Sequence, residues 1–157
     1  TGNFLESKGF EQYEISNYAR PCRRSRYNLR YWERKDYLGL GLGAASMVHN
    51  MRMSNTRDWG KYMENCGNPK KFREDVEFLE VPRQMEEFMF LGLRKTKGIS
   101  RKEFRRNFGR DLDQVYEKAL KRHLENGMLK ASGDRIYLSE EGVLVSNQAL
   151  SDFLFDC

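Results

Sequence analysis

Polar and aromatic side chains gather between residues 14 and 32, and their types could bind a flat, polar ligand. Glu14 and Asn17 stand at the end of a predicted strand, where a carboxylate and an amide could orient a substrate by hydrogen bonds. Asn17 could equally cap the following loop through its own side chain. Tyr31 and Trp32 could stack on a flat macrocycle while neighbouring arginines pair with its carboxylates. The alternative is that these aromatic residues only pack within the loop.

A glycine-rich run follows. Leucine and glycine alternate from residue 38 to residue 43, and the run ends at Gly43, Ala44 and Ala45. The alternation predicts a strand with one bare face, which a ligand or another backbone segment could approach closely. The competing interpretation is tight packing between this strand and a helix.

Residues that commonly bind metals are few and scattered. Cys22, Cys66 and Cys157 are an odd number and lie far apart in the sequence, which argues against a disulfide framework, a zinc site or a cluster site. This cysteine usage predicts a reducing, cytoplasmic setting. His49 falls at the tip of a predicted hairpin, and His123 lies on a helix beside cationic residues, where we expect it at the surface. No metal site is predicted in this chain.

The composition limits the classes of protein that the chain can belong to. With 157 residues, 39% hydrophobic and 32% charged, it can bury one good core or two small ones. No apolar run approaches the roughly 20 residues that a membrane-spanning helix needs. The formal net charge is +5, and cations crowd the segment from Arg20 to Lys35. That segment could bind an anionic partner or could be a solvated loop.

The first half of the chain alternates between predicted helices and strands. Residues 3–8 suit the end of a helix that stops at Gly9, and residues 10–15 alternate as a strand does. A long loop is predicted over residues 17–31. Residues 47–53 suit a hairpin, and Asp58 is a suitable N-cap for a helix over residues 59–66. We place a domain boundary in the charged stretch before Val81, which divides the chain into residues 1–80 and 81–157.

Residues 81–157 carry clear start and stop signals. Pro82 suits the first turn of a helix, and Ser100 with Glu103 forms a capping box for a second helix that ends at Gly109. A third helix is predicted from residue 111 or 113 to residue 125, followed by a hairpin about residues 132–134. Ser139 then caps a last helix that reaches about residue 155. Three helices, a two-stranded wing and a final helix are the order of a winged-helix domain.

Four motifs in this order resemble one protein family. They are Tyr-Glu-Ile-Ser-Asn-Tyr-Ala at residues 13–19, Tyr-Asn-Leu-Arg-Tyr-Trp at residues 27–32, the glycine-rich run, and Met-Glu-Glu-Phe-Met-Phe-Leu-Gly-Leu-Arg at residues 85–94. Together they resemble the radical S-adenosylmethionine proteins related to oxygen-independent coproporphyrinogen III oxidase, most closely the heme chaperone (HemW-type) branch. The resemblance implies an α+β chain in which the C-terminal part of a partial α/β (TIM-like) barrel precedes the winged-helix domain.

The resemblance also implies cofactors. The family binds a [4Fe-4S] cluster through a C-x-x-x-C-x-x-C triplet near its N-terminus, and the cluster works together with S-adenosylmethionine. This chain has no such triplet, so we expect a C-terminal fragment whose partner is the missing N-terminal part of its own barrel. The resemblance implies that backbone around Gly43, Ala44 and Ala45 approaches the adenosine of S-adenosylmethionine. Glu14, Asn17 and the aromatic residues at positions 31 and 32 are the candidate substrate contacts.

Two activities occur in that family. The oxidase decarboxylates two propionates of coproporphyrinogen III with a 5′-deoxyadenosyl radical, whereas the heme chaperone branch binds heme for delivery. The run from Glu14 to Asn17 favours the second branch, with heme or a porphyrin as the ligand. We expect the fragment itself to be inactive as an enzyme.

Two functions without catalysis compete with this interpretation. A winged helix could belong to a DNA-binding regulator, but its predicted recognition helix mixes Lys118 and Lys121 with Glu117 and Glu125. A mixed face binds phosphates poorly, so nucleic acid is not the expected partner. Residues 81–157 could instead be a docking module that packs on the barrel or on another protein.

Overall fold

Backbone contacts group the chain into two units in the computed structural model, which describes residues 2–155. The larger unit contains the residues up to Arg34 together with those from Val81 onward. The sheet unit runs from Lys35 to Glu80. The predicted boundary between residues 1–80 and 81–157 falls where the sheet unit ends, at Glu80. The structure differs in grouping the first 34 residues with the C-terminal part.

The N-terminal segment of the larger unit begins with α1 (Gly2–Ser7), which the chain leaves through Gly9 at φ +77°. Strand β1 (Glu11–Glu14) pairs antiparallel with β2 (Asn17–Ala19), and α2 (Arg26–Trp32) follows. Ser25 caps α2 by accepting a hydrogen bond from the Asn28 N–H at 3.2 Å. The single long loop predicted for residues 17–31 is therefore wrong, since this stretch contains a strand and a helix.

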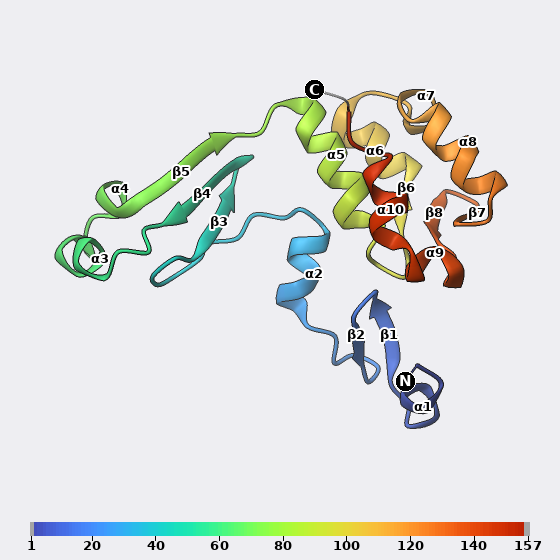
Figure 1. Ribbon diagram of the computed structural model, residues 1–157, viewed down its shortest axis with the longest axis horizontal. Coiled ribbons are helices and arrows are strands. Elements are labelled where there is room, and N and C mark those ends of the chain that lie inside the picture. The colour runs from blue at the N-terminus through green and yellow to red at the C-terminus, as the bar shows by residue number, and fades with distance from the viewer. Residues whose placement is uncertain (1, 156–157) are drawn as a thin grey trace. The chain divides into compact units, whose positions relative to one another are not determined.

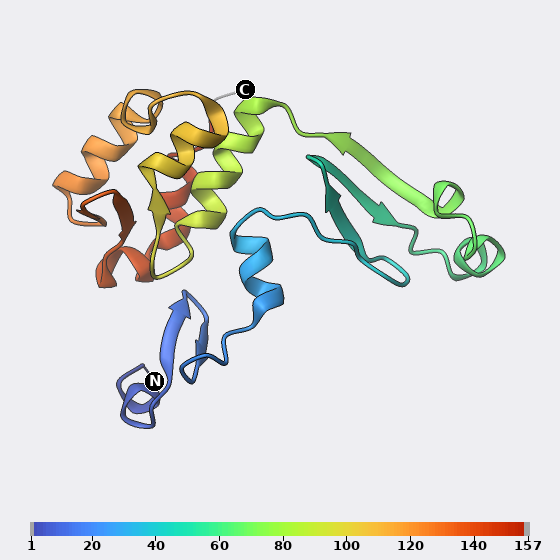
Figure 2. The same ribbon diagram turned by 180° about the vertical axis from the view of Figure 1, so that it is seen from behind.

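Helices form the main core of the larger unit (Figures 1 and 2). They are α5 (Val81–Gly92), α6 (Arg101–Phe108), α7 (Leu112–Val115) and α8 (Glu117–Glu125). Ser100 Oγ caps α6 by accepting from the Glu103 N–H at 3.0 Å, and Gly109 ends this helix at φ +66°, both as predicted. The predicted third helix is divided in two at Tyr116, whose φ is −116°.

A small antiparallel sheet lies against these helices in the order β6-β8-β7, from β6 (Ile99–Ser100), β8 (Arg135–Leu138) and β7 (Leu129–Ser132). The predicted hairpin is confirmed by the β7–β8 pairing, and it gains β6 as a third strand. Two short helices, α9 (Glu140–Leu144) and α10 (Ser146–Ser151), replace the single last helix that was predicted. Every buried member of the core lies between Met85 and Phe153.

The sheet unit is a three-stranded antiparallel sheet in the order β3-β4-β5, with β3 (Ala45–Val48), β4 (Met51–Asn55) and β5 (Arg73–Phe78). The predicted hairpin is confirmed: His49 and Asn50 form its turn at φ +49° and +62°. Helix α3 (Trp59–Asn65) is capped by Asp58 as predicted, and α4 (Pro69–Phe72) precedes β5. The strand predicted for residues 38–43 is wrong, because this run is an irregular loop.

The described chain therefore has a mixed α and β fold. All strand pairings among residues 2–155 are antiparallel. The barrel implied by the resemblance would need parallel strands, so it stays a prediction about a larger assembly. A search of the same residues found no helix that is both long and apolar enough to cross a membrane.

Residues 81–157 should unfold cooperatively when they are produced without the first 80 residues. The reason is that the fully buried residues of the main core cluster lie within this segment. The midpoint of thermal unfolding should fall, since the shortened chain loses the backbone hydrogen bond from Ile15 to Arg94 and the ion pair between Arg34 and Glu87. Circular dichroism melts of the two chains test this. A broad, non-cooperative melt of residues 81–157 would contradict it.

Candidate functional site

Glu14 is a fully buried carboxylate at the end of β1. Its Oε1 atom accepts hydrogen bonds from the Ser16 N–H at 2.9 Å and from the Asn17 side-chain amide at 2.5 Å. Its Oε2 atom is also buried and has no hydrogen-bond partner among the described residues. The Oε1 atom therefore stabilises the turn between β1 and β2, whereas the Oε2 atom lacks a hydrogen bond to any described residue.

The other edge of β1 is bound to the segment that follows α5. The Ile15 N–H donates to the Arg94 carbonyl at 3.0 Å, and the Thr96 N–H donates to the Tyr13 carbonyl at 3.3 Å. Glu14 and Lys95 form an antiparallel bridge between these hydrogen bonds. The buried carboxylate is thus held beside the C-terminal end of α5, although some 80 residues separate them in sequence.

Helix α2 packs against α5 through two cationic side chains, and both ribbon views show the two helices near each other (Figures 1 and 2). The Arg94 guanidinium lies over the Trp32 ring, with its Cζ atom 4.6 Å from the ring centroid. Arg34 Nε donates to Glu87 Oε2 at 2.8 Å, and only 11% and 17% of these two side chains are exposed. Arg94 Nε and Trp32 Nε1 are both buried, and neither has a hydrogen-bond partner in the part of the chain that the structure describes.

The predicted substrate residues are only partly brought together. Glu14 and Asn17 contact each other directly, and Trp32 is joined through Arg94 to the segment beside them. Tyr31 packs edge to face with Tyr27, with ring centroids 5.0 Å apart. Arg94 was missed in the sequence analysis, although it closes the motif at residues 85–94.

Part of the basic segment from Arg20 to Lys35 is used for internal contacts. Arg20 lies over the Phe10 ring, Arg24 pairs with Glu11 at 2.9 Å, and Arg34 pairs with Glu87. These three side chains are committed to the larger unit itself. The structure therefore gives this segment a packing role in addition to any role in binding an anionic partner.

The glycine-rich run forms a loop that is held against β4. The Gly43 N–H donates to the Thr56 carbonyl at 3.0 Å, and the Asn55 N–H donates to the Ala44 carbonyl at 2.9 Å. A Cβ atom at Gly39 would collide with the Ala45 carbonyl, so this glycine is required for packing. Gly43 has a φ of +66°, which side chains rarely adopt.

The three predicted S-adenosylmethionine contacts thus differ in what they can offer a ligand. The Gly43 amide and the Ala44 carbonyl are already bonded within the sheet unit. Ala45 lies on β3, an outer strand of the sheet, and its side chain is exposed. The Ala45 carbonyl lies against Gly39, so the exposed group of Ala45 is its side chain.

No three His, Cys, Asp or Glu side chains between residues 2 and 155 lie close enough together to bind a metal ion. Cys22 and Cys66 are exposed free thiols, and Cys157 lies outside the described residues. His49 is exposed at the hairpin turn, with its Nε2 atom 3.7 Å from Asp36 Oδ2. The described residues therefore contain no ligand set for an iron–sulfur cluster.

The surface position predicted for His123 is wrong. Its side chain is only 2% exposed, and its Nε2 atom lies 2.9 Å from Asp152 Oδ2, which also accepts from Arg122 Nη1 at 2.9 Å. The sequence pattern did not show this, since the neighbours of His123 in sequence are cationic and its partner comes from the end of α10.

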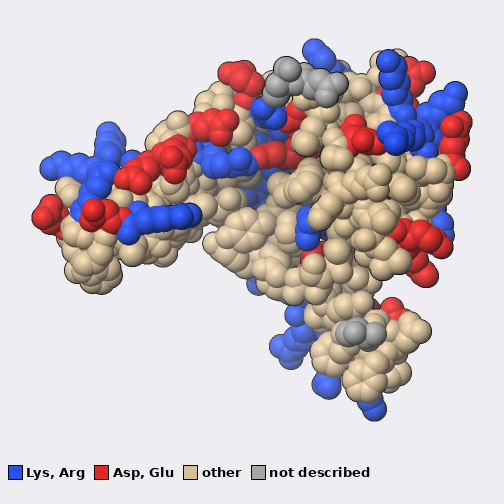
Figure 3. Space-filling view, viewed as in Figure 1, with Lys and Arg blue, Asp and Glu red and all other residues tan. Residues whose placement is uncertain are grey.

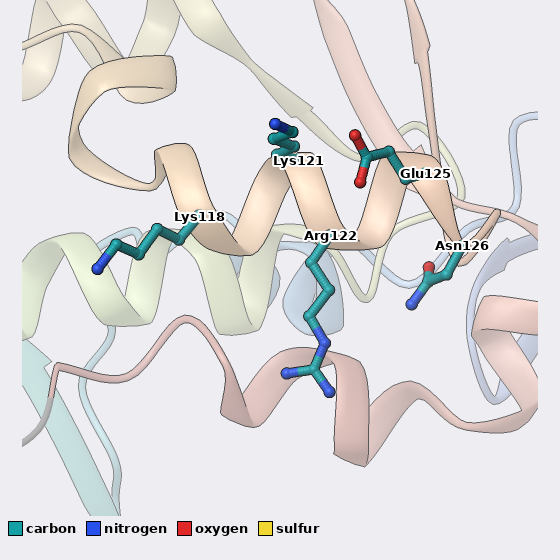
Figure 4. A pocket seen from close by; sticks show the side chains of 5 residues that line it. All are labelled: Lys118, Lys121, Arg122, Glu125 and Asn126. Atoms are coloured by element: carbon teal, nitrogen blue, oxygen red, sulfur yellow. The ribbon is translucent and has the colours of Figure 1, made fainter.

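A shallow hollow runs along the outer side of α8 (Figure 4). It is lined by Lys118, Lys121, Arg122, Glu125 and Asn126. Figure 3 shows positive and negative side chains intermixed at the end of the larger unit that carries α7 and α8. The hollow therefore lacks the continuous positive surface that a nucleic-acid backbone requires.

The sequence of the chain is similar to a known domain family and to several known proteins. Residues 79–145 match the HemN C-terminal domain. The chain is 36% identical over 150 residues to the heme chaperone HemW of Bacillus subtilis (strain 168), covering 96% of this chain and 40% of that protein. It is 31% identical over 155 residues to the heme chaperone HemW of Escherichia coli (strain K12), covering 96% of this chain and 39% of that protein.

A mitochondrial relative and a solved structure extend the comparison. The radical S-adenosyl methionine domain-containing protein 1 of Danio rerio is 28% identical over 166 residues, covering 97% of this chain and 37% of that protein. The solved structure of coproporphyrinogen III oxidase (HemN) from Escherichia coli, a radical SAM enzyme, matches with a TM-score of 0.71 at 15% identity. It covers 96% of this chain and 38% of that chain. The chain thus spans about two fifths of the length of the relatives it matches.

Replacing Asn17 with alanine should lower the free energy of unfolding by roughly 1 kcal/mol, because it removes a hydrogen bond to a buried carboxylate. Urea denaturation measures the change. Asn107→Ala is the matched control, since Asn107 is exposed on α6. Equal stability of the Asn17→Ala variant and the unmodified protein would mean that Asn17 does not hold the turn.

Proposed function

Because the chain belongs to the family of the HemN and HemW proteins, we propose that it is the C-terminal portion of a radical S-adenosylmethionine protein that binds heme as a heme chaperone. Its relatives from Bacillus subtilis and Escherichia coli carry the name heme chaperone HemW. Among the two activities of the family, heme binding agrees better with the run from Glu14 to Asn17. Coproporphyrinogen III oxidation is the other activity that the intact protein could have.

The observation that carries this proposal is the stacked pair of Trp32 and Arg94 beside the buried Glu14. A tetrapyrrole has a large flat apolar face and carboxylate groups at its edge. An indole ring offers a flat apolar surface, and a guanidinium group suits carboxylates. Tyr31 lies next to Trp32 on α2 and would enlarge the aromatic surface. Asn17 would act by holding Glu14 in place.

S-Adenosylmethionine and a [4Fe-4S] cluster are the proposed cofactors of the intact protein. When bound, the cluster would supply the electron that cleaves S-adenosylmethionine into methionine and a 5′-deoxyadenosyl radical. Its ligands would come from the part of the family's length that this chain does not span. Within this chain, the exposed side of Ala45 would contact the nucleoside, and the hydrogen bonds of Gly43 and Ala44 would hold the preceding loop against β4.

The proposal includes a domain arrangement. Residues 1–80 would complete a barrel together with an N-terminal partner segment, and residues 81–157 would form a winged-helix domain. The order α5, β6, α6, α7–α8 and the β7–β8 hairpin supports the second part. We expect this domain to serve as a docking module, since the charges along α8 are mixed. The free thiols of Cys22 and Cys66 support a cytoplasmic location.

Heme titration of the intact protein tests the function. Trp32→Ala should weaken heme binding about tenfold, equivalent to 1.4 kcal/mol, because the variant lacks the stacking surface. The change in heme absorbance on binding gives the dissociation constants. Trp59→Ala is the control, since Trp59 is 66% exposed on α3 in the sheet unit. Absence of heme binding by the unmodified protein would refute the proposal.

Ala45→Leu should weaken S-adenosylmethionine binding by the intact protein, with little change in the melting temperature. An exposed strand position accepts leucine without strain, but the added atoms would occupy the space of the nucleoside. Gly43→Val tests this less clearly, because a branched side chain at φ +66° destabilises the loop by itself. Calorimetric titration and a thermal melt measure the two effects. Unchanged affinity of the Ala45→Leu variant would remove Ala45 from the site.

A further inference from the structure

We infer that Arg94 binds a carboxylate of the ligand, acting as the residue that distinguishes a porphyrin with free propionates from one without. The inference rests on the proposed function, because it assumes that the aromatic surface of Trp32 receives a porphyrin. It adds a residue outside the motifs of residues 13–32 and names the ligand group that this residue would bind, a carboxylate. Arg94 follows the C-terminal end of α5, so the C-terminal domain would contribute directly to ligand recognition.

The guanidinium group of Arg94 has a buried donor and lies over the Trp32 ring. Arg94 Nε is a buried donor with no hydrogen-bond partner among residues 2–155. A buried polar group without a partner destabilises the fold, and more so when the group is charged. The stacking on Trp32 fixes the plane of the guanidinium, since its Cζ atom is 4.6 Å from the ring centroid. A guanidinium with a fixed plane and an unpaired Nε–H is prepared for a planar acceptor such as a carboxylate.

A second unpaired donor lies beside Arg94. Trp32 Nε1 is buried and has no hydrogen-bond partner within residues 2–155, and it belongs to the ring that Arg94 covers. Two N–H groups without partners in adjoining side chains favour a ligand group that accepts hydrogen bonds over one that donates them. Trp32 and Arg94 are each only half-buried as whole residues, so a ligand can approach this pair from solvent.

Other charged side chains near Arg94 and Trp32 include Arg34, Glu87 and Glu14. The charge of Arg34 is matched by Glu87, with 2.8 Å between Nε and Oε2. Glu14 Oε2 is an unsatisfied acceptor near the Arg94 backbone, but it forms no hydrogen bond to Arg94. A direct ion pair between Glu14 and Arg94 is therefore the competing structural role, and the experiment must separate it from ligand binding.

The experiment compares heme with heme dimethyl ester, in which both carboxylates are blocked. The unmodified intact protein should bind heme about tenfold more tightly than the ester. Arg94→Gln should abolish this preference, because it should weaken heme binding more than it weakens binding of the ester. Arg94→Lys should keep part of the preference, since it retains the charge without the planar group. Arg105→Gln is the matched control, because Arg105 is exposed on α6 of the same unit.

The outcomes separate the inference from the proposed function. Equal affinities of the unmodified protein for heme and its ester would overturn the inference and leave heme binding standing. Binding of neither compound would overturn both. A lower melting temperature of Arg94→Gln that is restored by adding Glu14→Gln would assign Arg94 to an ion pair with Glu14, which also overturns the inference. An unaltered preference in Arg94→Lys and Arg94→Gln would do the same.

Discussion

The larger unit depends on the contact between the end of α5 and the segment from β1 to α2. A hairpin of two short strands has little stability in water, and a seven-residue helix such as α2 is too short to persist alone. Both acquire their fixed positions from α5, through the Ile15–Arg94 backbone hydrogen bond, the Arg94–Trp32 stacking and the Arg34–Glu87 ion pair. The geometry of the candidate site is therefore set by residues more than 50 positions away.

The backbone after α5 is in turn fixed by close packing. A Cβ atom at Gly92 would collide with the Ile99 side chain, and one at Gly98 would collide with the Ile136 carbonyl. These approaches bring β6 against α5 and β8, so the segment between the two glycines has little freedom. Arg94 lies in that segment, and its side chain is consequently presented from a rigid turn. A rigid donor loses less conformational entropy when it binds an acceptor.

Local signals in the sequence were sufficient for the ends of most elements, because caps and turns depend on neighbouring residues. Asp58, Ser100 and Gly109 act as predicted. Predictions were wrong where the structure of a segment depends on residues that are distant in the sequence. The glycine-rich run alternates as a strand does, but β4 holds it as a loop. Strand β5 was missed because most of its side chains are exposed and most of its residues are charged. Glu14 was found from its motif, whereas the role of Arg94 required the fold to bring α5 to β1.

The charges on α8 show how internal contacts limit what a surface can bind. Arg122 and His123 both bond to Asp152, so this cation and this imidazole hold the C-terminal segment against α8. Lys118 and Lys121 remain along the outer side, where Glu125 offsets their charge. Neutralising a phosphate backbone needs several cations that are not committed elsewhere. Because Arg122 and His123 are bonded to Asp152, α8 has few uncommitted cations for such a partner.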